Sequence, residues 1–247
     1  MGYYSERLEL LERWVWKDTE ISNFYYTIAL NNKDHLAQLI SVVCGAPYLQ
    51  ITEYFNELER DELLRRHLSQ ALKASEGKDL EFDYGRRLGW YAFTRVLKPR
   101  VVVETGVEQG VGACVLASAL LRNASEGFSG RYFGTEIRRD AGRLLSGQYA
   151  GVGRILFDDS IRSLNALDEK IDLFINDSDH SAEYEYREYL TIADKLSAGG
   201  VILGDNAHVT DSLSRYSRET NRNFVFFSEK PDNHWYPGAG IGISFPR

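Results

Sequence analysis

The feature that most constrains the fold is an alternation of short apolar runs with helical segments from residue 84 onward. YGRRLGWYAFTRVL is predicted to be helical, and the β-branched run RVVVETG follows it. Strands that alternate with helices predict an α/β fold, a parallel sheet covered by helices on both faces. Four more apolar runs continue the pattern, GRYFGTEI, GRILFDD, IDLFIND and GGVILGDN, with helical segments predicted at 112–121, 138–147, 160–167 and 181–196, and then two further β runs, NFVFFSE and GAGIGISF.

Residues 1–80 have a different hydrophobic pattern, because their apolar residues recur at helical spacing. We read 5–75 as several helices, and the break ASEGKD contains Gly77. The 247 residues suffice for one large α/β domain with an N-terminal appendage. We therefore predict a helical extension at 1–80, serving as a lid or a dimerisation face, followed by the α/β domain at 81–247.

Polar side chains follow each of the first five predicted strands. A single acid at such a position is usually a helix cap or a turn former. Acids after all five are a pattern that chance rarely produces, and ligands of open α/β sheets bind at the carboxyl ends of the strands. We expect these residues to converge on one edge of the sheet: Glu104, Glu136, Asp158, Asp159, Asp177, Asp179, Asp205 and Asn206.

A glycine-rich turn, VVVETGVEQGVGA, joins the first strand to its helix. Glycines here let the backbone approach a ligand and present the amides of the helix N-terminus, although a tight turn alone needs them too. The spacing of Gly106, Gly110 and Gly112 is not the dinucleotide fingerprint, and the lysine of a phosphate-binding loop is absent. Glu104 at the strand end suits a ligand with a cationic group.

Together these motifs resemble the class I S-adenosylmethionine-dependent methyltransferases over roughly residues 84–247. The resemblance implies a Rossmann-like, doubly wound, mostly parallel seven-stranded sheet whose last strand is antiparallel. It also implies S-adenosyl-L-methionine as cofactor, with its ribose held by the acid at 136. By the same resemblance, the residues that bind this cofactor are Glu104, Gly106, Gly110, Glu136, Asp159, Ser160 and Asp177.

The segment IDLFINDSDHSAEYEYREYL, followed by LSAGGVILGDN, resembles the metal-dependent O-methyltransferases of the catechol and caffeoyl-CoA type and the bacterial sugar and macrolide O-methyltransferases. The resemblance implies that Asp177, Asp205 and Asn206 hold Mg²⁺ or another divalent cation. Three oxygen ligands leave about three octahedral positions for water and substrate hydroxyls. A cation there lowers the pKa of an acceptor hydroxyl before it attacks the sulfonium methyl group.

His180 occupies the position at which the catechol-type enzymes carry a lysine base. Histidine suits a base near neutral pH, and the resemblance implies that His180 and Asp177 are the catalytic residues. A histidine at a helix start more often bonds locally, but the downstream Asp205-Asn206 pair reverses that preference. Asp179 either orients His180 or caps the helix that begins near Ser181.

Composition and charge exclude several classes of binding partner. The formal charge of −7 comes with no basic stripe, which argues against nucleic acid as the main partner. No apolar run reaches the ~20 residues of a membrane span, and the charged N-terminus is not a signal peptide. Cys44 and Cys114 lie in apolar or small-residue surroundings and indicate reduced thiols. We expect a cytoplasmic protein that does not bind membranes, and a homodimer through the N-terminal helices is one of the two roles open to those helices.

The predicted reaction is metal-assisted O-methylation of a small acceptor, such as a sugar, a polyketide or another secondary metabolite. Two alternatives stay open: a metal-independent methyltransferase, and a non-catalytic protein that binds S-adenosylmethionine or serves as an interaction scaffold. Loops at this sheet edge often cover the acceptor, and aromatic side chains give flat walls. The acceptor residues predicted on this basis are His208, His234, Trp235 and Tyr236, although the last three equally suit a packed turn.

Overall fold

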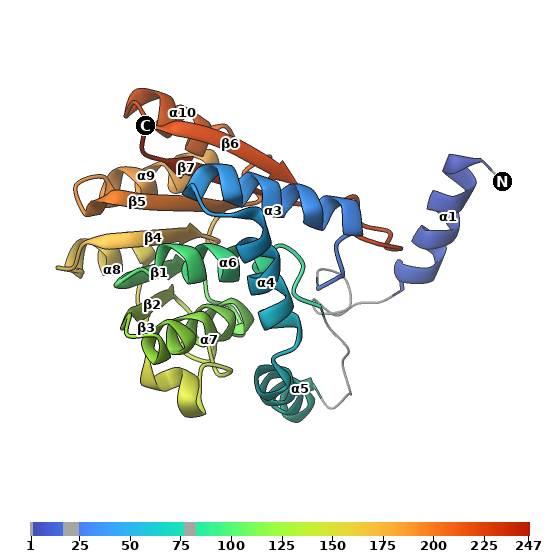
Figure 1. The fold of residues 1–247 in the computed structure, drawn as a ribbon, viewed down its shortest axis with the longest axis horizontal. Coiled ribbons are helices and arrows are strands. Elements are labelled where there is room, and N and C mark those ends of the chain that lie inside the picture. Colours follow the sequence, from blue (N-terminus) through green and yellow to red (C-terminus); the bar gives the residue numbers. More distant parts are fainter. Residues whose placement is uncertain (1, 17–24, 77–82) are drawn as a thin grey trace.

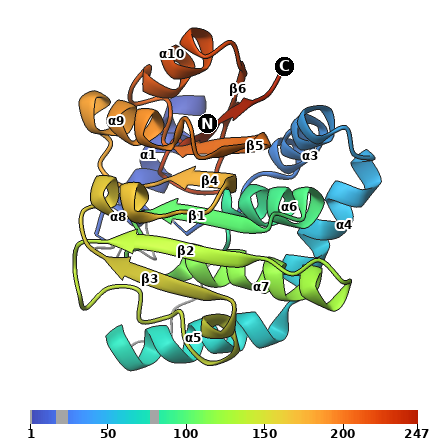
Figure 2. The ribbon, with the colours of Figure 1, turned by 90° about the vertical axis from the view of Figure 1, so that its left-hand side faces the viewer.

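A seven-stranded sheet forms the centre of the protein, with the strand order β3-β2-β1-β4-β5-β7-β6 (Figures 1 and 2). The computed structural model describes residues 2–16, 25–76 and 83–247. Neighbouring strands from β3 to β5 pair in parallel, whereas β7 is antiparallel to both β5 and β6. The strands are β1 (Val101–Thr105), β2 (Arg131–Glu136), β3 (Gly153–Phe157), β4 (Ile171–Asn176), β5 (Leu196–Asp205), β6 (Asn223–Ser228) and β7 (Gly240–Phe245).

Helices cover both faces of this sheet (Figure 2). One layer contains α3 (Leu30–Cys44), α4 (Tyr48–Glu59), α5 (Glu62–Glu76), α6 (Arg87–Leu97) and α7 (Val111–Ser125). The opposite layer contains α8 (Ser160–Ala166), α9 (Ala182–Ile192) and α10 (Ser212–Glu219). Figure 1 shows α1 (Tyr3–Trp14) apart from both layers, at one end of the molecule.

Alternate residues of the central strands pack against the two helix layers. Val102 packs in the core on the α6 and α7 side, whereas its neighbours Val101 and Val103 pack on the α8 and α9 side. This follows from the two-residue period of a strand, in which successive side chains point to opposite faces. Both faces are buried, as is usual for parallel strands, and this explains why these runs read as continuous apolar segments.

The fold prediction is confirmed, including the antiparallel strand, but one predicted helix is wrong. Residues 138–147 form turns that lead into a 3₁₀ helix, Gly147–Gly151. Tertiary contacts override the local periodicity, because the Gly142 amide donates to the Glu108 carbonyl at 2.6 Å and Leu144 to Gln109 at 3.1 Å. The segment is thus tied to the glycine turn. The sequence also overextended the helix at 181–196, where β5 already begins at Leu196, and missed α10.

The helices before residue 80 share a core with the sheet domain. Leu36 of α3 and Phe55 of α4 belong to the same buried cluster as Trp90 of α6 and Leu116 of α7. The predicted domain boundary and Gly77 lie outside the described residues, so the boundary stays a prediction. Within the described ranges, none of the helices is both long and apolar enough to cross a bilayer.

Candidate active site

A cavity of about 660 Å³ opens at the carboxyl ends of the parallel strands. Its wall combines the ends of strands β1 and β2 with the loops that follow β3, β4 and β5. The structure therefore brings the polar strand ends together as their topology predicts. The predicted cofactor, metal and base residues that line this cavity are Glu104, Gly106, Glu136, Asp159, Ser160, Asp177, His180 and Asn206.

The glycine turn after β1 crosses directly over the loop that follows β4. Gly106 has a φ of +78°, and a Cβ at this position would lie 2.1 Å from the Asp177 carbonyl oxygen. Only glycine fits such an approach without displacing that backbone. Gly110, with a φ of +103°, is the N-cap of α7, but it is not part of the cavity wall. The Glu108 side chain in the same turn is exposed to solvent.

Glu104 is a buried carboxylate at the wall of the cavity. It accepts a hydrogen bond from the Tyr132 hydroxyl. Burial raises the pKa of Glu104 to about 7. The neighbouring position is glycine for a steric reason, because a Cβ on Gly112 would lie 2.4 Å from Glu104 Oε1 and 2.8 Å from the Trp90 ring.

Glu136, at the end of β2, is held by backbone amides. Its Oε2 accepts from the Glu108 amide and its Oε1 from the Arg138 amide, each at 3.0 Å. These bonds fix the orientation of the carboxylate at the cavity wall. A carboxylate has about four acceptor positions, so oxygen lone pairs remain for a ligand.

The loop after β3 joins the cavity wall to α9. Asp159 is the N-cap of α8, where it accepts from the Arg162 amide, and it also accepts from the Tyr184 hydroxyl at 2.9 Å. The Ser160 hydroxyl lies 2.8 Å from the same tyrosine oxygen and donates to Glu188. Burial raises the pKa of Glu188 to about 7, and Thr105, Asn176 and Ser178 also donate to it.

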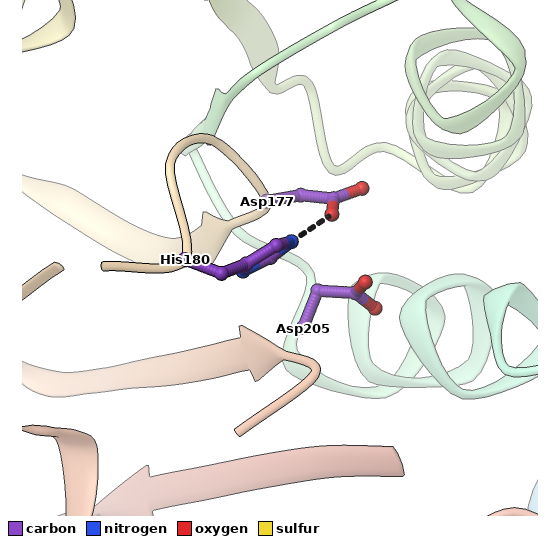
Figure 3. Close-up of side chains that lie close together, drawn as sticks. All are labelled: Asp177, His180 and Asp205. Atoms are coloured by element: carbon purple, nitrogen blue, oxygen red, sulfur yellow. Dashed lines mark ion pairs between the residues drawn. The ribbon is translucent and has the colours of Figure 1, made fainter. Parts of the chain in front are cut away.

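A cluster of three ligand-type side chains lies at the same sheet edge (Figure 3). One donor atom from each of Asp177, His180 and Asp205 lies within 4.8 Å of the other two. His180 Nε2 is 3.8 Å from Asp177 Oδ1. Burial and the neighbouring Asp205 charge hold the pKa of Asp177 well above its usual range.

Arg86 is the functional neighbour that the sequence reading missed. Its Nε and Nη2 donate to the two carboxylate oxygens of Asp205, with 2.6 Å between Nη2 and Oδ2. Burial opposes the charge of Asp205, but the Arg86 guanidinium lowers the pKa of that carboxyl below its usual value. The ion pair joins residues 119 positions apart. The only local signal was the Arg86-Arg87 pair at the start of α6, which resembles the exposed start of a helix.

His180 is oriented by Glu185 rather than by Asp179. Its Nδ1 lies 3.5 Å from Glu185 Oε1, and its Nε2 lies 3.3 Å from Asn206 Nδ2. The Glu185 hydrogen bond raises the pKa of His180, although burial opposes this. Asp179 instead accepts from the Ser181 amide at 2.7 Å, in the turn before α9, whose N-cap residue is Ser181.

The predicted acceptor residues are divided by the structure. Tyr236 contributes to the cavity wall, whereas His208, His234 and Trp235 are not among the described residues that line it. His208 is exposed. His234 is buried against Tyr26, with their ring centroids 5.2 Å apart, and its Nδ1 accepts from the Tyr236 amide at 3.1 Å. The packed-turn alternative therefore describes His234 better.

Comparisons with known proteins bear on this arrangement. Residues 103–207 match the model of a methyltransferase domain family, and no curated protein matches the chain. The O-methyltransferase TomG from Streptomyces achromogenes, solved in complex with SAM, is 16% identical, with a TM-score of 0.56 over 76% of this chain and 90% of that one. An O-methyltransferase from Bacillus cereus, in complex with SAH, is 16% identical, with a TM-score of 0.54 over 89% and 100%.

A putative caffeoyl-CoA O-methyltransferase from Staphylococcus aureus is 12% identical, with a TM-score of 0.57 over 88% of this chain and all of that one. At such identities the similarity shows a shared fold. The sheet order and the antiparallel β7 described above belong to that fold. Residues 103–207 thus match a methyltransferase domain, and the chain as a whole shares the fold of these O-methyltransferases.

Proposed function

We propose that the protein transfers the methyl group of S-adenosylmethionine to a hydroxyl group of a small acceptor, with His180 as the general base. One observation carries the proposal. All the residues predicted to bind the cofactor except Gly110 line the same cavity as His180, so a bound cofactor and a base are within reach of one acceptor. The acceptor class favoured by the histidine is a sugar, polyketide or other secondary-metabolite hydroxyl.

The cofactor lies along β1, β2 and the loop after β3 in this proposal. Glu104, with Gly106 and Gly110, binds the amino acid end. A pKa near 7 means that Glu104 gains from a cationic ammonium group, which favours the ionised carboxylate. Glu136 accepts hydrogen bonds from the ribose hydroxyls. Asp159 and Ser160 lie at the adenine end, and Asp177 borders the methyl group.

His180 accepts the acceptor proton during methyl transfer. The hydroxyl oxygen attacks the sulfonium methyl carbon, the carbon–sulfur bond breaks, and its electron pair returns to sulfur. Glu185 accepts a hydrogen bond from Nδ1–H in the neutral tautomer, which leaves Nε2 as the basic nitrogen. The imidazolium formed is stabilised by Glu185 and then loses its proton to solvent.

We further propose that a divalent cation such as Mg²⁺ binds at Asp177, Asp205 and Asn206. The chemistry of the donors supports this: two carboxylates and an imidazole nitrogen lie within 4.8 Å of one another, and burial together with the neighbouring Asp205 charge raises the pKa of Asp177. When bound, the cation would stabilise the oxyanion of the acceptor. His180 belongs to this geometric cluster as well, so its Nε2 has to stay free of the cation to act as a base.

The test uses tritium-labelled S-adenosylmethionine and a panel of phenolic, catechol, sugar and polyketide acceptors. We expect label in a hydroxyl-bearing acceptor, and a loss of about 100-fold or more in kcat for His180→Gln. His208→Gln is the matched control, because His208 is exposed and lies outside the cavity wall. Binding of S-adenosylhomocysteine without transfer to any hydroxyl would instead indicate the non-catalytic alternative.

We also propose a homodimer that forms through the N-terminal helices. Two leucines of α1 are open to solvent, Leu8 with 59% and Leu11 with 42% of its surface exposed. Exposed apolar faces of this kind favour association. Light scattering after gel filtration should give twice the chain mass of 28.2 kDa, and Leu8→Glu with Leu11→Glu should give a monomer. A monomeric wild-type protein would refute the dimer and leave the lid role.

The proposed compartment is the reducing cytoplasm. Cys44 and Cys114 are both free thiols, as cytosolic proteins generally keep them. Cell fractionation of the source organism tests this, and recovery outside the cytoplasm would contradict it.

A further inference from the structure

Arg86 places a permanent positive charge on a carboxylate assigned to a divalent cation. It is the N-cap residue of α6 and is only 7% exposed. Its guanidinium meets Asp205, which is 0% exposed, through two parallel N–H···O contacts. Such bidentate pairs are among the strongest hydrogen-bonded ion pairs. Asp205 therefore has a resident cationic partner before any metal binds.

A second carboxylate lies on the other side of the same guanidinium. Arg86 Nη1 is 3.6 Å from Glu229 Oε2, and Glu229 is 3% exposed. The Tyr26 hydroxyl donates to Glu229 Oε2 at 3.0 Å. The other oxygen, Oε1, is buried and has no hydrogen-bond partner among the described residues. A buried acceptor without a donor is costly. A hydrogen bond from Arg86 to Glu229 Oε1 would therefore be favourable.

We propose that Arg86 and a divalent cation compete for Asp205, and that Arg86 moves toward Glu229 when the cation binds. The proposal rests on the proposed function only in taking Asp177 and Asp205 as cation ligands. A guanidinium on Asp205 repels a second cation at the same carboxylate and occupies the lone pairs that face α6. Glu229 makes the exchange feasible, because it neutralises Arg86 after Asp205 has been released.

The experiment measures Mn²⁺ binding to the full chain, by electron paramagnetic resonance and calorimetry, without cofactor or acceptor. Arg86→Met keeps the length of the side chain but removes its charge, and we expect at least tenfold tighter Mn²⁺ binding. Arg87→Met is the matched control: it removes the neighbouring charge, but Arg87 hydrogen-bonds Tyr25, and its guanidinium carbon lies 4.2 Å from the centre of that ring. We expect a smaller gain in Mn²⁺ affinity there than in Arg86→Met, because the Arg87 charge acts on Asp177 and Asp205 without a hydrogen bond to either.

Glu229→Gln gives a second measurement with the opposite sign. It removes the charge that receives Arg86, so Mn²⁺ binding should weaken several-fold. Circular dichroism spectra and melting curves establish that each variant is folded, and Glu229→Gln carries the test if Arg86→Met does not fold.

Each outcome decides the matter. Unchanged or weaker binding in folded Arg86→Met overturns the competition, and so does the absence of binding in both wild type and Arg86→Met at millimolar Mn²⁺. Unchanged binding in Glu229→Gln overturns the movement of Arg86. If Arg86→Met alone binds Mn²⁺, competition holds, and the metal part of the proposed function fails separately.

Discussion

Gly106→Ala is a decisive perturbation, because Gly106 lies where the glycine turn crosses over the loop that follows β4. The φ of +78° strains any residue with a Cβ, at a cost of about 1 kcal/mol or more. The added Cβ would also lie 2.1 Å from the Asp177 carbonyl oxygen and 2.8 Å from the Ser178 Cα, so the loop after β4 has to move by about 1 Å. Such overpacking costs typically 1–3 kcal/mol.

The two costs together predict a loss of about 3 kcal/mol in the free energy of unfolding. For a chain of this size that lowers Tm by about 6–12 °C. Gly45→Ala is the matched control, because Gly45 also has a left-handed φ, +63°, but has nothing within 4 Å of an added Cβ. It should lose only about 1 kcal/mol.

The assay combines urea denaturation with calorimetric titration of S-adenosylhomocysteine. We expect Gly106→Ala to bind this ligand at least tenfold more weakly and Gly45→Ala to bind it normally. Equal destabilisation of both variants, with ligand binding intact in Gly106→Ala, would refute the reasoning that the close approach positions the site.

Three further results are expected. In Glu185→Gln, the acid limb of the pH profile of kcat/KM should move to lower pH, because the Glu185 hydrogen bond raises the pKa of His180 and only neutral histidine accepts the proton; an unmoved limb argues against His180 as the base. EDTA should abolish turnover and Mg²⁺ should restore it, whereas full activity in chelator supports the metal-independent alternative. Glu136→Ala should weaken S-adenosylhomocysteine binding about tenfold or more, since charged hydrogen bonds contribute roughly 1.5–3 kcal/mol, and unchanged affinity excludes Glu136 from the ribose site.

The sheet could be predicted because each strand is specified by the residues of its own short segment. The run Val101–Thr105, for example, combines β-branched residues with burial on both faces, and Glu104 near its end marks the sheet edge. Parallel pairing then determines which strand ends meet. The meeting of Glu104, Glu136 and Asp177 at one cavity therefore follows from topology, without knowledge of any side-chain contact.

The features that the sequence did not reveal depend on contacts between distant residues. Segment 138–147 has helical periodicity, but hydrogen bonds to Glu108 and Gln109 hold it in turns. Arg86 is an ordinary helix-start arginine until the fold brings it to Asp205. Glu185 reads as one more acid on the solvated side of a helix, and only the turn at Asp179 and Ser181 points His180 toward it.

The acids at the sheet edge differ in what neutralises them, and this difference indicates where chemistry occurs. Tyr132 donates to Glu104, backbone amides donate to Glu136, and Arg86 pairs with Asp205. Asp177 has His180 as its ion-pair partner, at 3.8 Å, and its pKa is raised because burial and Asp205 leave its charge poorly compensated. If His180 is the base, as proposed, the proton that it gains places positive charge beside Glu185, whose hydrogen bond already raises the pKa of His180. The electrostatics of the site would then strengthen the base as methyl transfer proceeds.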